Sequence, residues 1–157
     1  MSINTYSPSD VTLLLDGYKI EGWESISIKR GTQSYSFIKG RHGKNTRVKN
    51  FDTSAVIEVS ILQTADSHEI LNEVHTQDIA PDANSARLSV TLKDRSGTSA
   101  FQSDDAYIVG FPEVKFSQDF ETRVWSIQCQ TTHIYKIGGN LRPTTPLFDS
   151  IFKKVTN

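Results

Sequence analysis

Short segments in which apolar and polar residues alternate dominate the chain and predict a mainly β protein. In residues 25–29, Ile26 and Ile28 share one face while serine and lysine occupy the other, which is the pattern of a half-buried strand. Residues 13–15 run into Asp16-Gly17, a pair that favours a tight hairpin turn because both residues tolerate positive φ. Further strands are predicted at residues 55–62, 88–92, 100–101, 107–109, 114–116 and 124–135.

One helix interrupts the series of strands. Ile70, Leu71 and Val74 form an apolar stripe at helical spacing, and Asp66 with Glu69 three residues later fits a capping box. The helix is expected over residues 66–78 because the proline at position 81 requires it to end beforehand.

The alternation disappears between residues 31 and 54, which are mostly polar and contain three glycines. This segment is expected to form a long loop or a hairpin that projects from the body of the protein. The 157 residues are enough for one domain, with residues 1–10 as an N-terminal segment and residues 138–157 as a C-terminal arm that docks. The apolar residues of the arm are expected to pack within the chain; they are Leu147, Phe148, Ile151 and Phe152.

The net charge of only -1 is the sum of two oppositely charged segments. Residues 25–51 contain seven basic residues and no acid: Lys29, Arg30, Lys39, Arg41, Lys44, Arg47 and Lys49. Residues 52–86 contain seven acids and no lysine or arginine: Asp52, Glu58, Asp66, Glu69, Glu73, Asp78 and Asp82. Unlike surfaces on one molecule favour head-to-tail contact between copies, which closes into rings or extends into tubes.

Two other interpretations of the charge stay open. The segments could pair within one monomer, where exposed ion pairs contribute little. Alternatively, the basic segment could bind single-stranded nucleic acid, with Tyr35 and Phe37 as stacking platforms. The motif Gly40-Arg41-His42-Gly43 resembles a loop that clamps a nucleotide backbone, but its flanks indicate strands and favour a simple glycine turn. Self-association is preferred because the adjoining acids oppose affinity for phosphate.

The sequence contains no pattern typical of a catalytic, cofactor or metal site, so the protein is not expected to be an enzyme. His68 and His75 are seven positions apart without a third ligand and are expected to be solvated. Cys129 is expected to be a buried structural thiol, because His133 would lie about 13 Å away along the same strand. Asp104-Asp105 is expected to be a polar turn or the start of a strand.

The single cysteine and the absence of a signal peptide favour a protein made and used in a reducing cytosol. The apolar stretches are far shorter than the roughly 20 residues that span a bilayer, so no membrane location is expected.

Several local patterns, taken in their order along the chain, resemble the tail tube proteins of contractile-tailed phages. The resemblance extends from about Val11 to Tyr135. It rests on the turn Asp16-Gly17, the run 26–30, the glycine loop 40–44, the segment Asn50-Phe51-Asp52 with the strand 55–62, the run 62–67 that leads into the helix, and the segments 111–114 and 121–127.

The resemblance implies two packed antiparallel sheets, as a sandwich or a partly open barrel, flanked by one α-helix and carrying a long projecting loop. It also implies hexameric rings that stack into a hollow tube in the virion tail, assembled in the cytoplasm of a host bacterium, through which DNA passes without specific binding. The partners would be other copies of the chain, the tail sheath, a baseplate or tube initiator, a tape measure protein and a tail terminator. Inner tube subunits of type VI secretion systems or phage-tail-like bacteriocins are the closest alternative, since they share the fold.

Two sets of residues are expected to serve such an assembly. The subunit interface would pair basic and acidic residues, namely Lys39, Arg41, His42, Lys44, Arg47 and Lys49 with Asp66, Glu69, Glu73 and Asp78. The lumen would be lined by a face of small uncharged residues that stays wet without gripping phosphate, namely Ser126, Gln128, Gln130 and Thr132.

Overall fold

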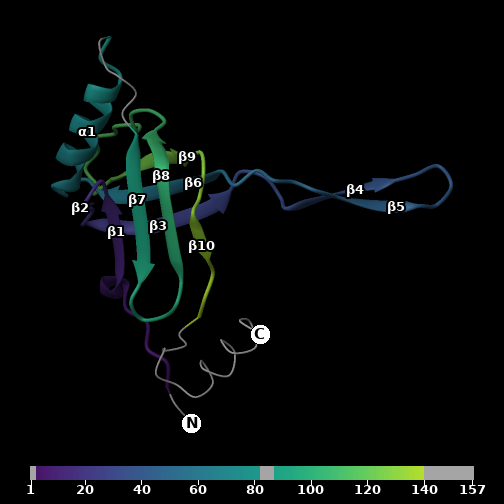
Figure 1. The fold of residues 1–157 in the computed structure, drawn as a ribbon. Helices are drawn as coiled ribbons and strands as arrows, with labels where there is room; N and C mark the ends of the chain where they lie inside the picture. The colour runs from purple at the N-terminus through teal and green to yellow at the C-terminus, as the bar shows by residue number, and fades with distance from the viewer. Residues whose placement is uncertain (1–2, 82–86, 140–157) are drawn as a thin grey trace.

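A computed structural model describes residues 3–81 and 87–139 of the chain (Figure 1). The strands are β1 (Val11–Leu15), β2 (Tyr18–Lys19), β3 (Trp23–Arg30), β4 (Tyr35–Lys39), β5 (Asn45–Lys49), β6 (Ala55–Leu62), β7 (Leu88–Asp94), β8 (Ala100–Ile108), β9 (Thr122–Cys129) and β10 (Ile134–Lys136). The helix α1 (Ser67–Asp78) lies between β6 and β7, and a short 3-10 turn (Pro8–Asp10) precedes β1.

Eight strands form one antiparallel sheet in the order β2-β1-β7-β8-β9-β6-β3, with β10 paired to β8 beside this path. The sheet folds over itself, so that β1, β7 and β8 cross in front of β3 and β6 (Figure 1). Strands β4 and β5 make a separate hairpin that projects far from this body. The mainly β fold with one helix and a projecting hairpin, which the sequence analysis expected, is confirmed, and its two layers belong to one continuous sheet that does not close into a barrel.

The core lies between the two layers and is built from the alternating apolar positions of the strands. Ile28, Ile57, Ile127 and Ile108 stand opposite one another across β3, β6, β9 and β8 and form one row of the inner face. The last three of these side chains are almost completely buried, whereas Ile28 on the edge strand is partly buried. This row holds four strands together, from β3 near the start of the chain to β9 near its end, because cross-strand apolar pairs are the unit of sheet stabilisation.

The helix begins and ends where the sequence predicts, but its start is different in detail. Asp66 is the N-cap residue, yet its side chain makes no capping hydrogen bond, so the predicted capping box is wrong. The first turn is held instead by Ser67, whose hydroxyl donates to the Glu21 carbonyl and accepts from the Glu21 N–H, both at 2.8 Å. The start of the helix is thus anchored by a contact between residues 46 positions apart, which is not a helix cap because its backbone partner is Glu21 and not an N–H of the first turn.

Three strand boundaries differ from the prediction. Residues 107–108 are the end of the long strand β8, and residues 114–116 form no strand. The predicted strand 124–135 is two strands, since β9 ends at Cys129 and β10 turns away to pair with the beginning of β8. Asp104 and Asp105 lie inside β8, at a bulge, and are neither a turn nor a strand start. The predicted C-terminal arm, with Leu147, Phe148, Ile151 and Phe152, lies almost entirely outside the described residues.

Gly22 connects β2 to β3 at a position where only glycine fits. Its φ is +76°, and a Cβ placed there would lie 2.5 Å from the Cβ of Ala65. Gly17, in the first hairpin turn, has a φ of +88° and nothing within 4 Å of its would-be Cβ.

We expect Gly22→Ala to lower the free energy of unfolding by more than Gly17→Ala does. Positive φ costs an L residue about 1–2 kcal/mol in both variants, and overpacking adds about 1–3 kcal/mol at Gly22 only. Urea denaturation of the two variants measures the difference. Equal losses of stability would show that the contact between Gly22 and Ala65 is not tight.

Candidate functional site

The β4–β5 hairpin is the most exposed part of the described chain, since every residue of both strands is exposed. It carries the predicted basic interface residues, which are Lys39, Arg41, His42, Lys44, Arg47 and Lys49. Arg47 lies over the ring of Tyr35 at 4.2 Å, and Lys49 lies over the ring of Phe51 at 5.3 Å. These cation–π contacts support the shape of a hairpin that has no core of its own.

A polar network fixes the direction of the hairpin at its root. Asp52 accepts hydrogen bonds from the Ser54 N–H at 2.9 Å and from the hydroxyls of Thr32 and Ser54 at 2.8 and 3.0 Å. These donors, the Ser54 backbone first, lower the pKa of the Asp52 carboxyl below its usual value. Arg30 adds a second tie, donating to the Thr132 hydroxyl at 3.0 Å, and that hydroxyl donates to the Thr53 carbonyl at 2.9 Å.

The predicted acidic interface residues lie on α1 or at its N-cap, at the opposite end of the molecule from the tip of the hairpin (Figure 1). Asp66, Glu69 and Glu73 are exposed, and Asp78 is partly buried. No ion pair in the described part of the chain joins α1 to the hairpin. The geometry thus separates the two charged surfaces and gives no support to the alternative in which they pair within one monomer.

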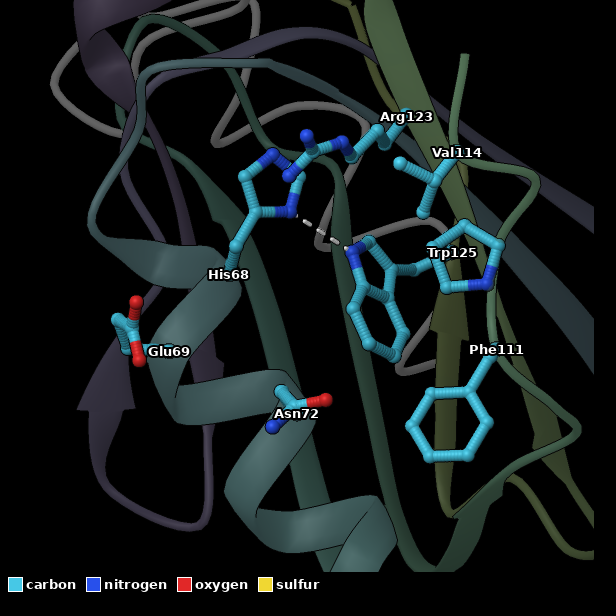
Figure 2. A pocket seen from close by; sticks show the side chains of 8 residues that line it. His68, Glu69, Asn72, Phe111, Val114, Arg123 and Trp125 are labelled. Carbon is cyan, nitrogen blue, oxygen red and sulfur yellow. Dashed lines mark hydrogen bonds between the residues drawn. The ribbon is translucent and has the colours of Figure 1, made fainter. Parts of the chain in front are cut away.

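A cavity of about 330 Å³ opens between α1 and residues 111–114 (Figure 2). Glu69 and Asn72 line it from the helix, and Phe111 and Val114 line it from the loop opposite. The segment 109–121 leaves five large apolar side chains exposed, which are Val109, Phe111, Val114, Phe116 and Phe120. An apolar group of this size beside acidic residues is typical of an interaction surface.

His68 and Trp125 form the inner wall of this cavity (Figure 2). His68 Nε2 is 2.9 Å from the Leu62 carbonyl, which can only accept, so Nε2 carries the proton. The Trp125 indole N–H then donates to His68 Nδ1 at 3.1 Å. Burial, with the Arg123 charge as a further cause, lowers the pKa of His68 below its ordinary value.

The prediction that His68 and His75 are solvated is wrong, because both side chains are buried. His75 packs edge-on against Phe111 with ring centroids 4.6 Å apart. The two histidines therefore belong to the junction between α1 and the sheet. The described residues contain no group of three or more side chains suited to a metal ion.

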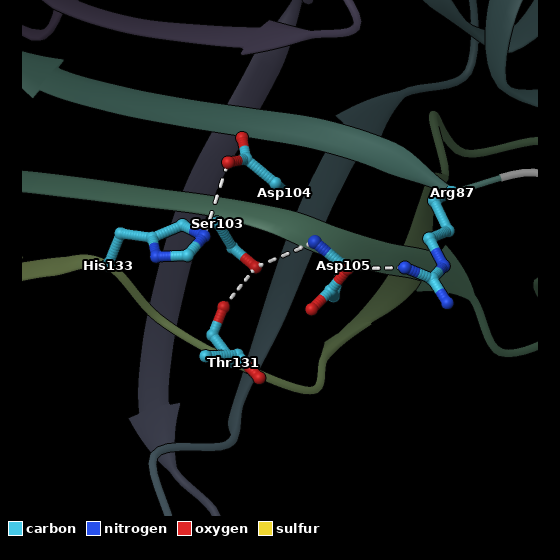
Figure 3. Close-up of polar contacts among 6 residues, drawn as sticks. All are labelled: Arg87, Ser103, Asp104, Asp105, Thr131 and His133. Atoms are coloured by element: carbon cyan, nitrogen blue, oxygen red, sulfur yellow. Dashed lines mark hydrogen bonds and ion pairs between the residues drawn. The ribbon is translucent and has the colours of Figure 1, made fainter.

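A second polar cluster surrounds the bulge in β8 (Figure 3). Asp104 lies 3.2 Å from His133, and Asp105 lies 3.6 Å from Arg87. Ser103 is fully buried and its hydroxyl donates to the Thr131 carbonyl at 2.6 Å. The two aspartates make separate contacts on the strand, and the cluster holds the connection between β9 and β10 against β8.

Cys129 is buried and unpaired, as predicted. Burial raises the pKa of its thiol to about 11, so the thiol stays protonated and unreactive near neutral pH.

The predicted lumen residues are only partly brought together. Ser126 and Gln128 point to the outer face of β9, opposite the buried Trp125 and Ile127, and Gln130 follows the end of the strand. Thr132 belongs instead to the network at the hairpin root.

Strands β6 and β3 extend this outer face, and their alignment with β9 could not be predicted from the sequence of one strand. Glu58 stands opposite Ser126 and Ser27 in the ladder. Ser60 stands opposite Ser25 in the next row. The polar outer positions of β3 could be found from its alternation, but their alignment with β9 depends on the sheet order.

The chain is 28% identical to the structural protein ORF10 of Pseudomonas phage KPP10 in an alignment 157 positions long, which covers 94% of this chain and 90% of that protein. No protein-family model matches the sequence.

Three solved structures have a similar fold. A chain of the sheath–tube complex of an extracellular contractile injection system (PVC) aligns with a TM-score of 0.57 and 11% identity, over 87% of this chain and 93% of that chain. A chain of the virion of a native gene transfer agent aligns with a TM-score of 0.58 and 10% identity, over 88% and 100%. A chain of the tube-terminating cap of the anti-feeding prophage aligns with a TM-score of 0.57 and 7% identity, over 90% and 95%. At these identities the likeness shows the fold, and it confirms the resemblance to contractile-tail tube proteins at that level.

We expect His68 to make the protein less stable as the pH falls. Its pKa is lower in the folded protein than in the unfolded chain, so the unfolded chain binds the proton first and stability decreases as the pH drops below the unfolded value near 6.5. Urea denaturation between pH 8 and 5.5 measures this slope, which should be smaller in His68→Gln. The matched control is His42→Gln, which replaces an exposed histidine in the hairpin turn; an unchanged slope in His68→Gln would contradict the assignment.

Proposed function

We propose that this protein is the tube subunit of a contractile phage tail. Its copies form hexameric rings that stack into a hollow tube, and the tube is the conduit through which DNA is delivered. The protein resides in the tail of the virion, and its work is geometric, with no catalytic step.

The observation that carries the proposal is the likeness of nearly the whole chain to assembly components. The curated relative is a structural protein of a phage, and the structural relatives come from a sheath–tube complex, a gene transfer agent particle and a tube cap. The fold adds a physical reason, because a hairpin with every residue exposed and a separate acidic helix suit a subunit that recognises its own copies.

The subunit interface joins the basic hairpin of one copy to the acidic helix of another. Head-to-tail pairing of unlike surfaces closes into rings or continues into tubes, whereas pairing of like surfaces gives only dimers. The net charge near zero lets many copies stack closely without strong repulsion.

The polar outer face of β9, β6 and β3 lines the lumen. Ser126 and Gln128 hydrogen-bond with water and carry no positive charge themselves. The same face carries one exposed cation, Lys29, in the row of Val56 and Gln128, and one exposed anion, Glu58, in the row of Ser126.

Gln130 continues this face beyond the end of the strand. Thr132 does not extend the face; its hydroxyl donates to the Thr53 carbonyl at the root of the hairpin. Within residues 3–81 and 87–139 the edge strand β3 pairs with β6 alone, and a neighbouring subunit would cover its open edge.

The other tail components would be the sheath, a tube initiator at the baseplate, a tape measure protein and a terminator. The sheath–tube complex and the tube cap among the structural relatives support partners of this kind. An inner tube subunit of a type VI secretion system or of a phage-tail-like bacteriocin is the second candidate; the phage source of the curated relative favours the tail.

We expect the purified protein to form rings or tubes of uniform width at low salt in negative-stain electron microscopy. Sedimentation at low and high salt should show large species that shrink as salt screens the contact between hairpin and helix. A monomer under both conditions would contradict the proposal.

The alternative function, binding of single-stranded nucleic acid, can be tested with the same purified protein. A labelled single-stranded oligonucleotide should not be retained at moderate salt by the proposed tube subunit. Retention that is lost in Lys39→Ala or Arg41→Ala would favour nucleic-acid binding over a tube.

A further inference from the structure

The two faces of the β4–β5 hairpin differ in chemistry. Tyr35 pairs with Lys49 and Phe37 pairs with Arg47, so one face combines aromatic rings with cations. The opposite face carries the pairs formed by Ser36 with Val48 and by Ile38 with Thr46, which are aliphatic and uncharged. Alternate residues of a strand point to opposite sides, so a partner can contact one face without the other.

The cavity beside α1 has one acidic and polar side and one apolar side, which complement the cations and aromatic rings of the hairpin face. Its helix side presents Glu69 and Asn72, with Glu73 on the same side of the helix one turn after Glu69. Its loop side presents Phe111 and Val114. The walls of the cavity thus offer negative charge and apolar surface within a space of about 330 Å³, which suits one or two inserted side chains.

Arg123 selects which kind of side chain can enter. Its guanidinium lines the cavity and lies 5.7 Å from the ring of Phe116. A lysine or arginine inserted there would be repelled, whereas an aromatic ring interacts favourably with a guanidinium. Cations of an incoming segment would instead lie at the rim, near Glu69 and Glu73.

We propose that the aromatic and cationic face of the hairpin of one copy docks into this cavity of a second copy. Phe37 enters between α1 and residues 111–114, while Arg47 and Lys39 face Glu69 and Glu73 at the rim. This inference rests on the proposed tube assembly and assigns to it a receptor surface and one face of the hairpin.

The occupant is a second copy because the hairpin does not reach its own cavity. The hairpin projects from the body on the side away from α1 (Figure 1). Both surfaces are exposed: Phe37 of the hairpin is 67% exposed, and Phe111 of the cavity is 54% exposed. Buried aromatic anchors supply most of the affinity at such contacts, and rim charges supply orientation and rate.

The two faces of the hairpin provide matched variants on adjacent residues. Phe37→Ala and Ile38→Ala remove side chains of similar exposure, 67% and 56%, from opposite faces of β4. We expect Phe37→Ala to raise the concentration needed for assembly by about tenfold or more and Ile38→Ala to change it by less than about threefold, measured by sedimentation. Circular dichroism checks that both chains fold. Equal effects of the two variants, or a larger effect of Ile38→Ala, would overturn the inference.

A charge exchange tests the partner surface. Arg47→Glu and Glu69→Lys should each weaken assembly. The double variant with both substitutions should restore it, because every hairpin then meets a helix of opposite charge. Asp78→Lys is the control on the same helix, about 13 Å along its axis from Glu69, and should not restore assembly of Arg47→Glu. Rescue by Asp78→Lys but not by Glu69→Lys would overturn the assignment.

The outcomes separate this inference from the proposed function. If the unmodified protein forms no rings or tubes, the proposed function fails and this inference fails with it. If tubes form but neither Phe37→Ala nor Arg47→Glu weakens them, only this inference fails. If these two variants assemble normally but lose retention of a single-stranded oligonucleotide, the aromatic face binds nucleic acid and the docking proposal is overturned.

Discussion

The β4–β5 hairpin cannot bury its side chains within the described part of its own chain, and this constraint organises the rest of the structure. An isolated two-stranded hairpin is marginally stable in water, yet here every residue of both strands is exposed. The hairpin is held by cation–π contacts along its length and by the Asp52 network at its root. An arm with aromatic and cationic side chains and no internal core is most simply understood as half of an interface.

The body of the protein supplies the foundation for this arm. The row of isoleucines across β3, β6, β9 and β8 fixes the strands from which the hairpin emerges. The Arg30 and Thr132 contact then joins the end of β3 to the segment after β9. The same row sends Ser126 and Gln128 to the outer face. One core therefore determines both the direction of the arm and the composition of the proposed lumen.

Much of this architecture could be predicted from the sequence because period-two alternation reports burial directly. The local pattern predicts the strand at residues 55–62, the helix near residues 66–78 and the turn at Asp16-Gly17. The remaining features depend on contacts between residues distant in the sequence, which the local pattern does not report. Ser67 anchors the first turn of the helix by bonding to the backbone of Glu21, and His68 is held by its contacts with Leu62 and Trp125. The cavity beside α1 joins residues 68–72 to residues 111–125, so no local spacing of residues could reveal it.

Hydrogen–deuterium exchange of the hairpin amides tests the central claim most directly, because it reports whether β4 and β5 acquire a partner. In dispersed chains at high salt, the amides of residues 35–49 should exchange rapidly, as expected for exposed and locally opening structure. In assembled material at low salt, the same amides should become strongly protected while those of β6 and β9 change little. Equal exchange of the hairpin in dispersed and assembled protein would contradict the account.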